Sequence, residues 1–227
     1  MKKLDKGFFA VIDGTDGSGK QTQTKLLKER LEKEGFLVLS ISFPWYGSPS
    51  AKMVEKYLAG ELGDQVNKID GYMVSTFYAD DRLAHSPIIV EALNKGWVVI
   101  SDRYVTANMG HQGSKFSNKV DRNTYLNWVY DLEYVKNNIP KPDINFILHV
   151  PTEISQRLLE KRGEKKDIHE NDPDHLRRAE ETYLELPKLF KGFSLIECVE
   201  NNALLSAEAI HEILWKELFP LLKTNEI

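Results

Sequence analysis

Cysteine is nearly absent from this sequence, with Cys198 the single one among 227 residues. One thiol cannot form an intramolecular disulfide, which excludes the disulfide-stapled class of secreted domains and indicates the reducing environment of the cytoplasm. Cys198 lies within the apolar stretch 195–199, so we expect it in the hydrophobic core.

Positive charge is not in excess either, because 30 Lys and Arg stand against 34 Asp and Glu. This balance predicts neither a nucleic-acid partner nor an electrostatic attachment to a membrane surface. Long hydrophobic runs are also missing, since no segment approaches the roughly 20 apolar residues of a membrane-spanning helix. The composition therefore indicates a cytoplasmic protein without a nucleic-acid or membrane partner.

A glycine-rich stretch, residues 14–21, carries the strongest chemical signal. An apolar run typical of a buried strand precedes it, and an amphipathic helix pattern follows it. Strand, glycine-rich turn and helix is the context of a phosphate-binding loop, whose backbone N–H groups and helix N-terminus attract phosphate. The nucleotide triphosphate is predicted to contact Gly14, Gly17, Ser18, Gly19, Lys20, Gln21 and Thr22.

One position of this loop departs from the usual pattern. Ser or Thr normally follows the lysine and ligates Mg²⁺, whereas this chain has Gln21 after Lys20. Either Thr22 substitutes as a ligand, or the nucleotide and water hold the metal.

Strand-like and helix-like patterns alternate along the chain. Strands are predicted at 8–13, 37–43, 97–101, 144–150 and 194–199. Helices are predicted at 19–34, 50–58, 69–93, 104–112, 121–137, 152–161, 173–188 and 206–218, with Ser50 and Thr152 as N-caps. This order predicts one α/β domain over residues 1–227, with a five-stranded parallel sheet covered by helices on both faces. Residues 162–172 contain little apolar material and are predicted to form a mobile surface loop.

Three clusters of polar and aromatic residues follow predicted strands, at 13–21, 43–46 and 102–104. Ligands of parallel α/β sheets bind at the carboxyl ends of the strands. The three clusters are therefore expected to face one crevice.

At these residues the chain resembles the thymidylate kinases, P-loop enzymes that phosphorylate dTMP with ATP. The resemblance covers essentially the whole chain. It rests on Gly14-x4-Gly19-Lys20 with Asp16, Phe43-Pro44, Tyr78-x3-Arg82, Asp102-Arg103-Tyr104, Asn108 with Gln112-Gly113, Lys141-Pro142-Asp143, and a basic lid near Arg162. It implies the three-layer P-loop kinase fold, transfer of the γ-phosphoryl group of ATP to dTMP in dTTP biosynthesis, Mg²⁺ as cofactor, and a homodimer packed through helices beside the acceptor site.

The residues suit the roles that the resemblance implies on the phosphate side. Lys20 would hold ATP, and Arg103 would bind the acceptor phosphate, because a guanidinium matches phosphate oxygens bidentately. Asp102 would order Mg²⁺ or its water. Asp16 would accept a hydrogen bond from the 3′-hydroxyl of the acceptor.

The residues expected to bind the base of dTMP are inferred from their positions on a helix and from the resemblance together. Tyr78 and Arg82 lie four residues apart and share one helix face. The resemblance implies that Tyr78 stacks on thymine, that Arg82 donates to its 4-oxo group and that Asn108 reads its N3. The acceptor site is completed by Phe43, Pro44, Tyr46, Ala107, His111 and Gln112.

Some positions differ from many family members. Trp45 and Tyr46 stand where an arginine often follows Phe-Pro, Ala107 replaces a serine, and His111 replaces a tyrosine. These changes leave the selectivity for the acceptor open.

We expect the lid to supply the positive charge that stabilises the phosphoryl group during transfer. Some family members carry an arginine after the loop aspartate, where this chain has Gly17. Members without it use a basic residue of the lid, and Arg162 is our candidate, with Lys165 as the alternative.

Two other functions remain open at this point. The chain could phosphorylate another deoxynucleotide or nucleoside, or it could be a P-loop switch protein. Against the switch, a simple switch has no use for an acceptor site built from Asp16, Arg82 and Arg103.

Overall fold

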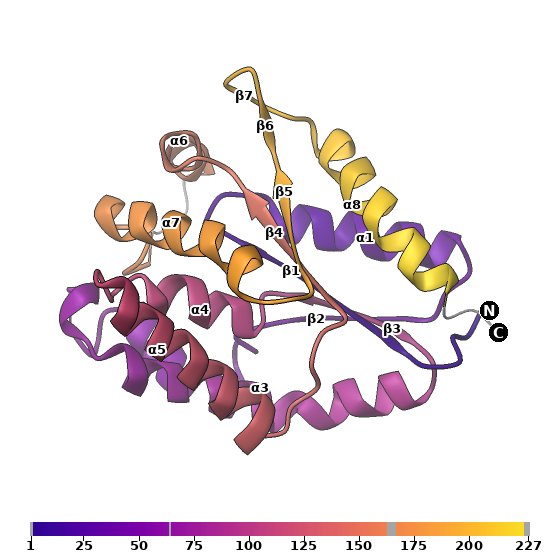
Figure 1. The fold of residues 1–227 in the computed structure, drawn as a ribbon, viewed down its shortest axis with the longest axis horizontal. Helices are drawn as coiled ribbons and strands as arrows, with labels where there is room; N and C mark the ends of the chain where they lie inside the picture. Colours follow the sequence, from indigo (N-terminus) through magenta and orange to yellow (C-terminus); the bar gives the residue numbers. More distant parts are fainter. Residues whose placement is uncertain (1, 64, 163–166, 225–227) are drawn as a thin grey trace.

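A five-stranded parallel sheet forms the centre of the molecule (Figure 1). The computed structural model describes residues 2–63, 65–162 and 167–224, with the side chains of residues 161 and 162 outside that description. The strands lie in the order β2-β3-β1-β4-β5, and each neighbouring pair is parallel. Their bounds are β1 Phe8–Gly14, β2 Val38–Ser42, β3 Val98–Asp102, β4 Ile144–His149 and β5 Phe193–Glu197.

Alternate residues of the central strand β1 face two separate cores. Phe8, Ala10 and Ile12 pack into the core under helices α1 (Lys20–Lys33) and α8 (Ala207–Lys223). Phe9 and Val11 pack into the opposite core, under the helices that cover the second face of the sheet. A strand that is buried on both faces needs a continuous apolar sequence, which is why residues 8–12 carry no polar side chain.

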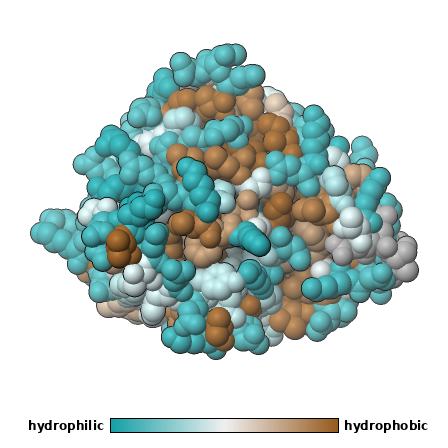
Figure 2. Space-filling view, in the orientation of Figure 1, coloured by the Kyte–Doolittle hydropathy of each residue, from teal (hydrophilic) through white to brown (hydrophobic). Residues whose placement is uncertain are grey.

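Helices cover both faces of the sheet, so the predicted three-layer α/β fold is confirmed (Figure 1). The helices on the second face and above the strand ends are α2 (Lys52–Leu58), α3 (Gly71–Asn94), α4 (Val105–Gly113), α5 (Lys119–Tyr130), α6 (Thr152–Arg162) and α7 (Pro173–Leu189), with a 3₁₀ turn η1 (Val66–Lys68). Within the described ranges, none of the helices combines the length and apolar content that crossing a bilayer requires. On the face of the molecule seen in Figure 2, hydrophilic residues surround separate hydrophobic patches.

Three boundaries differ from the sequence prediction. The helix predicted at 121–137 ends at Tyr130 and continues as a π-helix, η2 (Asp131–Lys136). The last helix extends to Lys223 through Pro220, because Leu222 beyond the proline is fully buried in the core. A short hairpin, β6 (Val199–Glu200) and β7 (Ala203–Leu204), follows β5. The buried position of Cys198 in the core is as predicted.

Both predicted N-caps are wrong, because each hydroxyl has a different partner. Helix α2 begins after Ala51, and Ser50 Oγ instead donates to Asp81 Oδ1 at 2.7 Å. Thr152 is the first residue of α6, and its backbone N–H donates to Glu180 Oε2 at 2.9 Å, as does its hydroxyl. In both places, a carboxylate distant in the sequence fixes a segment near the strand ends.

His149 joins three elements at the end of β4. Its Nδ1 lies 2.6 Å from Glu197 Oε2 of β5, and its Nε2 lies 2.9 Å from Glu180 Oε1 of α7. The hydrogen bond to Glu180 is the main cause that raises the His149 pKa, with Glu197 adding to it against partial burial. An imidazolium that donates to both carboxylates therefore holds α7 against the sheet.

We predict that His149→Asn loses more stability in mildly acidic solution than in alkaline solution. Folding raises the His149 pKa, so its stabilisation is complete below the ordinary value of about 6.5 and is lost as pH rises through the raised value. The difference in melting temperature between the wild type and His149→Asn should be larger at about pH 6 than at about pH 9. A difference that does not change with pH would mean that His149 is neutral in the fold.

Candidate active site

The phosphate-binding loop starts at the end of β1, beside β4. Gly14 pairs with Leu148 across the two strands, and a Cβ at Gly14 would lie 2.3 Å from the Leu148 carbonyl oxygen. Its φ of +137° is also one that L-residues rarely adopt. Glycine is therefore required at this position for the loop to leave the sheet.

Lys20, the first residue of α1, folds back onto its own loop. Its Nζ donates to the carbonyl oxygens of Thr15 at 2.8 Å and Gly14 at 3.2 Å, and lies 3.8 Å from Asp16 Oδ1. Burial, and then the nearby Arg103, lower the Lys20 pKa to about 8, against the attraction of Asp16. The loop thus presents a desolvated ammonium group, which a phosphate would stabilise in its charged form.

Asp16 and Arg103 form an ion pair between the loop and the end of β3. Arg103 Nη2 donates to Asp16 Oδ1, and Arg103 Nη1 lies 3.3 Å from His111 Nε2. Burial alone would raise the Asp16 pKa, but Arg103, His111 and Lys20 outweigh it and hold it well below the ordinary range. The φ of Arg103 is +65°, a strained conformation for this residue that turns the chain at the strand end.

One cavity contains every residue that the sequence assigns to the acceptor site, and we call it the acceptor cavity. These residues are Asp16, Phe43, Pro44, Tyr46, Tyr78, Arg82, Arg103, Ala107, Asn108, His111 and Gln112. They come from the loop, the ends of β2 and β3, and helices α3 and α4. The structure brings them together, although their individual roles stay predictions.

Two amides in this cavity have open acceptor atoms. Asn108 Nδ2 donates to the Ser75 carbonyl oxygen at 3.2 Å, and Gln112 Nε2 donates to Tyr57 Oη at 3.4 Å. Asn108 Oδ1 and Gln112 Oε1 are buried and have no hydrogen-bond partner in the part of the chain that the structure describes. The cavity therefore offers two carbonyl oxygens to a ligand with N–H donors.

Arg82 lines the acceptor cavity, but its guanidinium group is already occupied. Its Nε donates to Glu133 Oε1 at 3.0 Å, its Nη2 donates to the same carboxylate, and its Nη1 donates to the Tyr104 carbonyl oxygen at 3.2 Å. Both side chains of the ion pair are fully buried. Glu133 lies in the π-helix η2, and π-helical turns occur frequently at functional sites.

A second cavity, the phosphate cleft, adjoins the acceptor cavity. It is lined by Asp16, Gly17, Gly19, Lys20, Gln21, Thr22, Ser42, Phe43, Pro44, Tyr46, Asp102, Arg103, Leu158, Leu159, Asp167 and Glu170. Asp102 offers a carboxylate beside the oxygen donors of Gln21 and Thr22, which are groups that suit Mg²⁺. Gly14 and Ser18, the other two residues predicted to bind ATP, lie in the same loop, and Ser18 is buried.

The lid is described only in part. The Arg162 side chain and the whole of Lys165 lie outside the described residues, so the proposed role of either residue is not tested. Helix α6, which leads to this segment, packs on the loop: a Cβ at Gly17 would lie 3.0 Å from the Ser155 carbonyl oxygen and 3.3 Å from Leu159 Cγ.

Sequence reasoning missed three residues that line the acceptor cavity: Leu58, Asp167 and His169. It placed Tyr104 in the 102–104 cluster at the strand end but assigned it no role in the acceptor site. Asp167 and His169 fall in the segment predicted to be a mobile surface loop, yet His169 is buried. No local pattern indicates that this turn reaches the cavity.

Buried Asp13 was also missed as a structural centre of the site. Its carboxylate accepts from Gly14 N–H at 2.9 Å, Tyr183 Oη at 2.9 Å and Tyr104 N–H at 3.3 Å. Burial raises its pKa, against the influence of Arg103 and Lys20. One side chain thus connects β1, the start of α4 and helix α7.

Comparison with known proteins gives a consistent result. Residues 12–212 match the family model described as thymidylate kinase. A probable thymidylate kinase of Pyrococcus horikoshii is 32% identical over 207 residues, 91% of this chain and 93% of that protein. The thymidylate kinase of Caldicellulosiruptor saccharolyticus is 29% identical over 219 residues, 96% of this chain and 98% of that protein. The solved structure of thymidylate kinase from Candida albicans has the same fold, with a TM-score of 0.76 at 19% identity, covering 98% of this chain and 95% of that one.

We predict that Glu133→Ala strongly destabilises the protein, because it leaves the Arg82 guanidinium buried without its counter-ion. Breaking a buried ion pair in this way costs about 3–5 kcal/mol. Glu185→Ala is the matched control: Glu185 pairs with Arg122 at 3.1 Å nearer the surface, and its loss should cost about 1 kcal/mol or less. Urea unfolding at equilibrium measures both, and equal losses would contradict this account of Arg82.

Proposed function

Because this chain belongs to the thymidylate kinase family, we propose that its two adjoining cavities hold the two substrates of that reaction. The enzyme transfers the γ-phosphoryl group of ATP to dTMP, giving ADP and dTDP. In our proposal the triphosphate lies in the phosphate cleft and dTMP lies in the acceptor cavity. The main support is that Asp16 and Arg103 line both cavities, at the point where the two phosphates have to meet.

The cations of the site exchange partners when the substrates bind. Lys20, which donates to loop carbonyl groups and faces Asp16, turns to the outer phosphates of ATP. Arg103 leaves Asp16 for the acceptor phosphate, which its fork of N–H groups matches bidentately. Asp16 is then free to accept from the 3′-hydroxyl. Phosphoryl transfer requires mainly this positioning and neutralisation of charge.

The thymine base of dTMP is recognised by residues of the acceptor cavity that come from helices α3 and α4. The open carbonyl oxygen of Asn108 suits the N3–H donor of thymine, and Tyr78 supplies a ring beside it. Arg82 donates to Glu133 and Tyr104, so its direct contact with the 4-oxo group depends on the N–H groups that these partners leave free. Glu133 fixes the guanidinium plane for that contact.

Mg²⁺ fits the phosphate cleft by the chemistry of its donors. Asp102 would hold the ion or its water, with Gln21 or Thr22 as a second oxygen donor, and the ion would supply neutralisation of phosphate charge. Arg162 at the end of α6 is the proposed source of positive charge on the transferring group. This agrees with the packing of Ser155 on Gly17, which makes a side chain at that position of the loop a tight fit.

The remaining features of the proposal concern assembly and location. We propose one domain whose lid spans residues 162–172, acting in the cytoplasm as a homodimer. The exposed apolar side chains along α3 support an interface on this helix; they are Met73, Leu83, Ile88 and Val90. Burying these side chains against a second copy would remove apolar surface from water.

Binding and turnover across a panel of nucleoside monophosphates test the function. We expect dTMP alone to raise the melting temperature, as ATP alone does, because each ligand has its own cavity. Turnover should be fastest with dTMP. Stabilisation by ATP without turnover of any monophosphate would instead favour a nucleotide-binding switch, and faster turnover of another monophosphate would reassign the acceptor.

We predict that Asn108→Ala raises the KM for dTMP roughly tenfold, the effect of one lost hydrogen bond in a buried site. The KM for ATP should change little, because Asn108 lines only the acceptor cavity. Exposed Asn94→Ala, on helix α3, is the control and should leave both constants unchanged. An equal rise in both KM values would show that Asn108 acts through the fold.

A further inference from the structure

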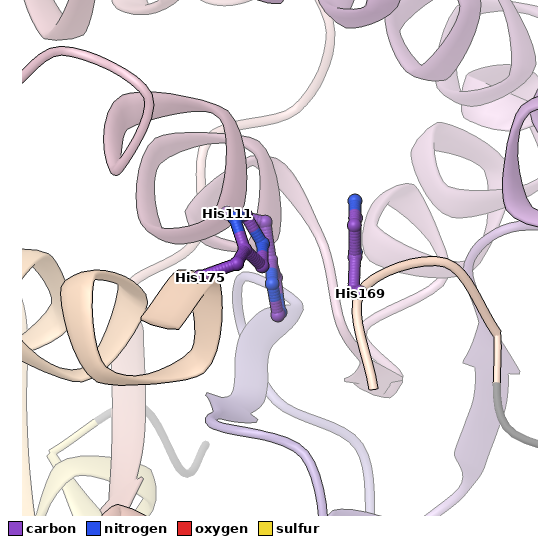
Figure 3. A group of neighbouring side chains, drawn as sticks. All are labelled: His111, His169 and His175. Carbon is purple, nitrogen blue, oxygen red and sulfur yellow. The ribbon is translucent and has the colours of Figure 1, made fainter. Parts of the chain in front are cut away.

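Three histidines from separate segments lie close together (Figure 3), and two of them, His111 and His169, line the acceptor cavity. His111 lies on α4, His169 in the turn that precedes α7, and His175 in the first turn of α7. All three are buried, and one nitrogen from each ring lies within 4.8 Å of the others. The proposed kinase reaction uses none of these nitrogens in a defined role.

Each ring is held by a protein partner at one nitrogen. His169 Nε2 lies 2.8 Å from Tyr57 Oη, His175 Nδ1 lies 3.2 Å from Ser114 Oγ, and His111 Nε2 faces Arg103. Histidines that bind metals usually donate the N–H of the second nitrogen to a partner, which fixes the ring and its tautomer. Tyr57 Oη and Ser114 Oγ can accept such a bond, whereas Arg103 can only donate.

The tautomer of His175 can be assigned from its neighbours. Ser114 Oγ donates its only hydrogen to the His111 carbonyl oxygen at 2.7 Å, so His175 Nδ1 must donate to Ser114. His175 Nε2 is therefore unprotonated. It is buried and has no hydrogen-bond partner among the residues described. His111 Nδ1 is likewise buried without a partner among those residues, but it carries the ring proton while Arg103 donates to Nε2, and it gains a free lone pair only when Arg103 leaves.

Burial keeps all three rings neutral. It lowers the His111 pKa to about 3, and it lowers the pKa values of His169 and His175 well below the ordinary range. Neutral imidazole is the form that binds a metal ion, because it keeps a lone pair on one nitrogen. An unused lone pair in a buried site is costly unless a ligand occupies it.

We propose that His111, His169 and His175 form a binding site for one Zn²⁺ ion. Three imidazole ligands are an established zinc donor set, and they leave a fourth position for water or another ligand. Hard cations such as Mg²⁺ prefer oxygen donors, so this site would be separate from the Mg²⁺ of the phosphate cleft in chemistry as well as in place.

Zinc binding requires the rings to turn. The ring planes of His111 and His169 are nearly parallel, 9° apart with centroids at 4.9 Å, and His175 is tilted by 30° to His169. Ligands about 2.1 Å from a tetrahedral ion lie roughly 3.4 Å from each other. Rotation about the Cβ–Cγ bonds therefore has to bring the three nitrogens closer together.

The surrounding charges are mixed, and they favour a cation once Arg103 has moved to a phosphate. Asp16 Oδ2 lies 4.0 Å from His111 Nε2 and can accept from that nitrogen when Nδ1 binds the ion. Asp167 accepts from the backbone N–H of His169 at 2.8 Å, which places another carboxylate in the same turn. Because His111 and His169 also line the acceptor cavity, zinc and acceptor binding are expected to affect each other.

The test uses the full chain, freed of metal with a chelator, with excess Mg²⁺, both without nucleotide and with saturating dTMP, whose phosphate draws Arg103 away from Asp16. We expect calorimetry to detect one equivalent of Zn²⁺ per chain and the melting temperature to rise. Co²⁺ should give the visible absorption of a four-coordinate ion. Absence of saturable binding of one equivalent, or of that spectrum, would overturn the proposal.

Variants identify the ligands. His175→Gln removes a ligand and should weaken binding more than tenfold, whereas His175→Cys supplies a thiolate and should retain it. Ser114→Ala removes the outer partner of His175 and should weaken binding roughly ten- to a hundredfold. His211→Asn, a substitution of a buried histidine on α8, is the control and should bind as the wild type does. Unchanged affinity in folded His175→Gln would place the ion elsewhere and refute the site.

Discussion

The carboxylate of Asp13 is the interaction on which the geometry of the site depends. It lies one residue before the end of the central strand and accepts hydrogen bonds from Gly14, Tyr104 and Tyr183. Those donors belong to the phosphate-binding loop, the junction between β3 and α4, and helix α7. Because a buried carboxylate is costly unless its oxygen atoms are satisfied, the three segments are held at fixed positions relative to one another.

Each arginine of the site has a carboxylate partner before any substrate binds. Arg103 pairs with Asp16, and Arg82 pairs with Glu133. The two pairs differ in what a ligand can do with them. The side chain of Arg103 is a quarter exposed, so it can change partners. The side chains of Arg82 and Glu133 are fully buried, so their ion pair keeps its position at the side of the acceptor cavity. When a phosphate binds, Arg103 exchanges Asp16 for the phosphate, while the pair of Arg82 and Glu133 stays unchanged.

The sequence predicts the sheet and most of the cavity lining because the decisive signals are local. An apolar strand followed by glycines locates the loop, and the i, i+4 spacing of Tyr78 and Arg82 places both on the cavity side of α3. What it does not predict depends on distant residues. Glu133 lies 51 positions from Arg82 in a π-helix, and His169 reaches the cavity through tertiary packing. Ser50 likewise has the sequence context of a helix cap, but in the fold its hydroxyl donates to Asp81, which is distant in the sequence.

The tight packing of Gly17 against Ser155 has an evolutionary consequence. A Cβ at position 17 would lie 3.0 Å from the Ser155 carbonyl oxygen, so α6 would have to give way slightly, and the φ of +76° is one that residues other than glycine rarely adopt. An arginine acquired in the loop would therefore cost stability unless a second change let α6 move. The two ways of supplying positive charge are thus separated by a step that weakens the fold.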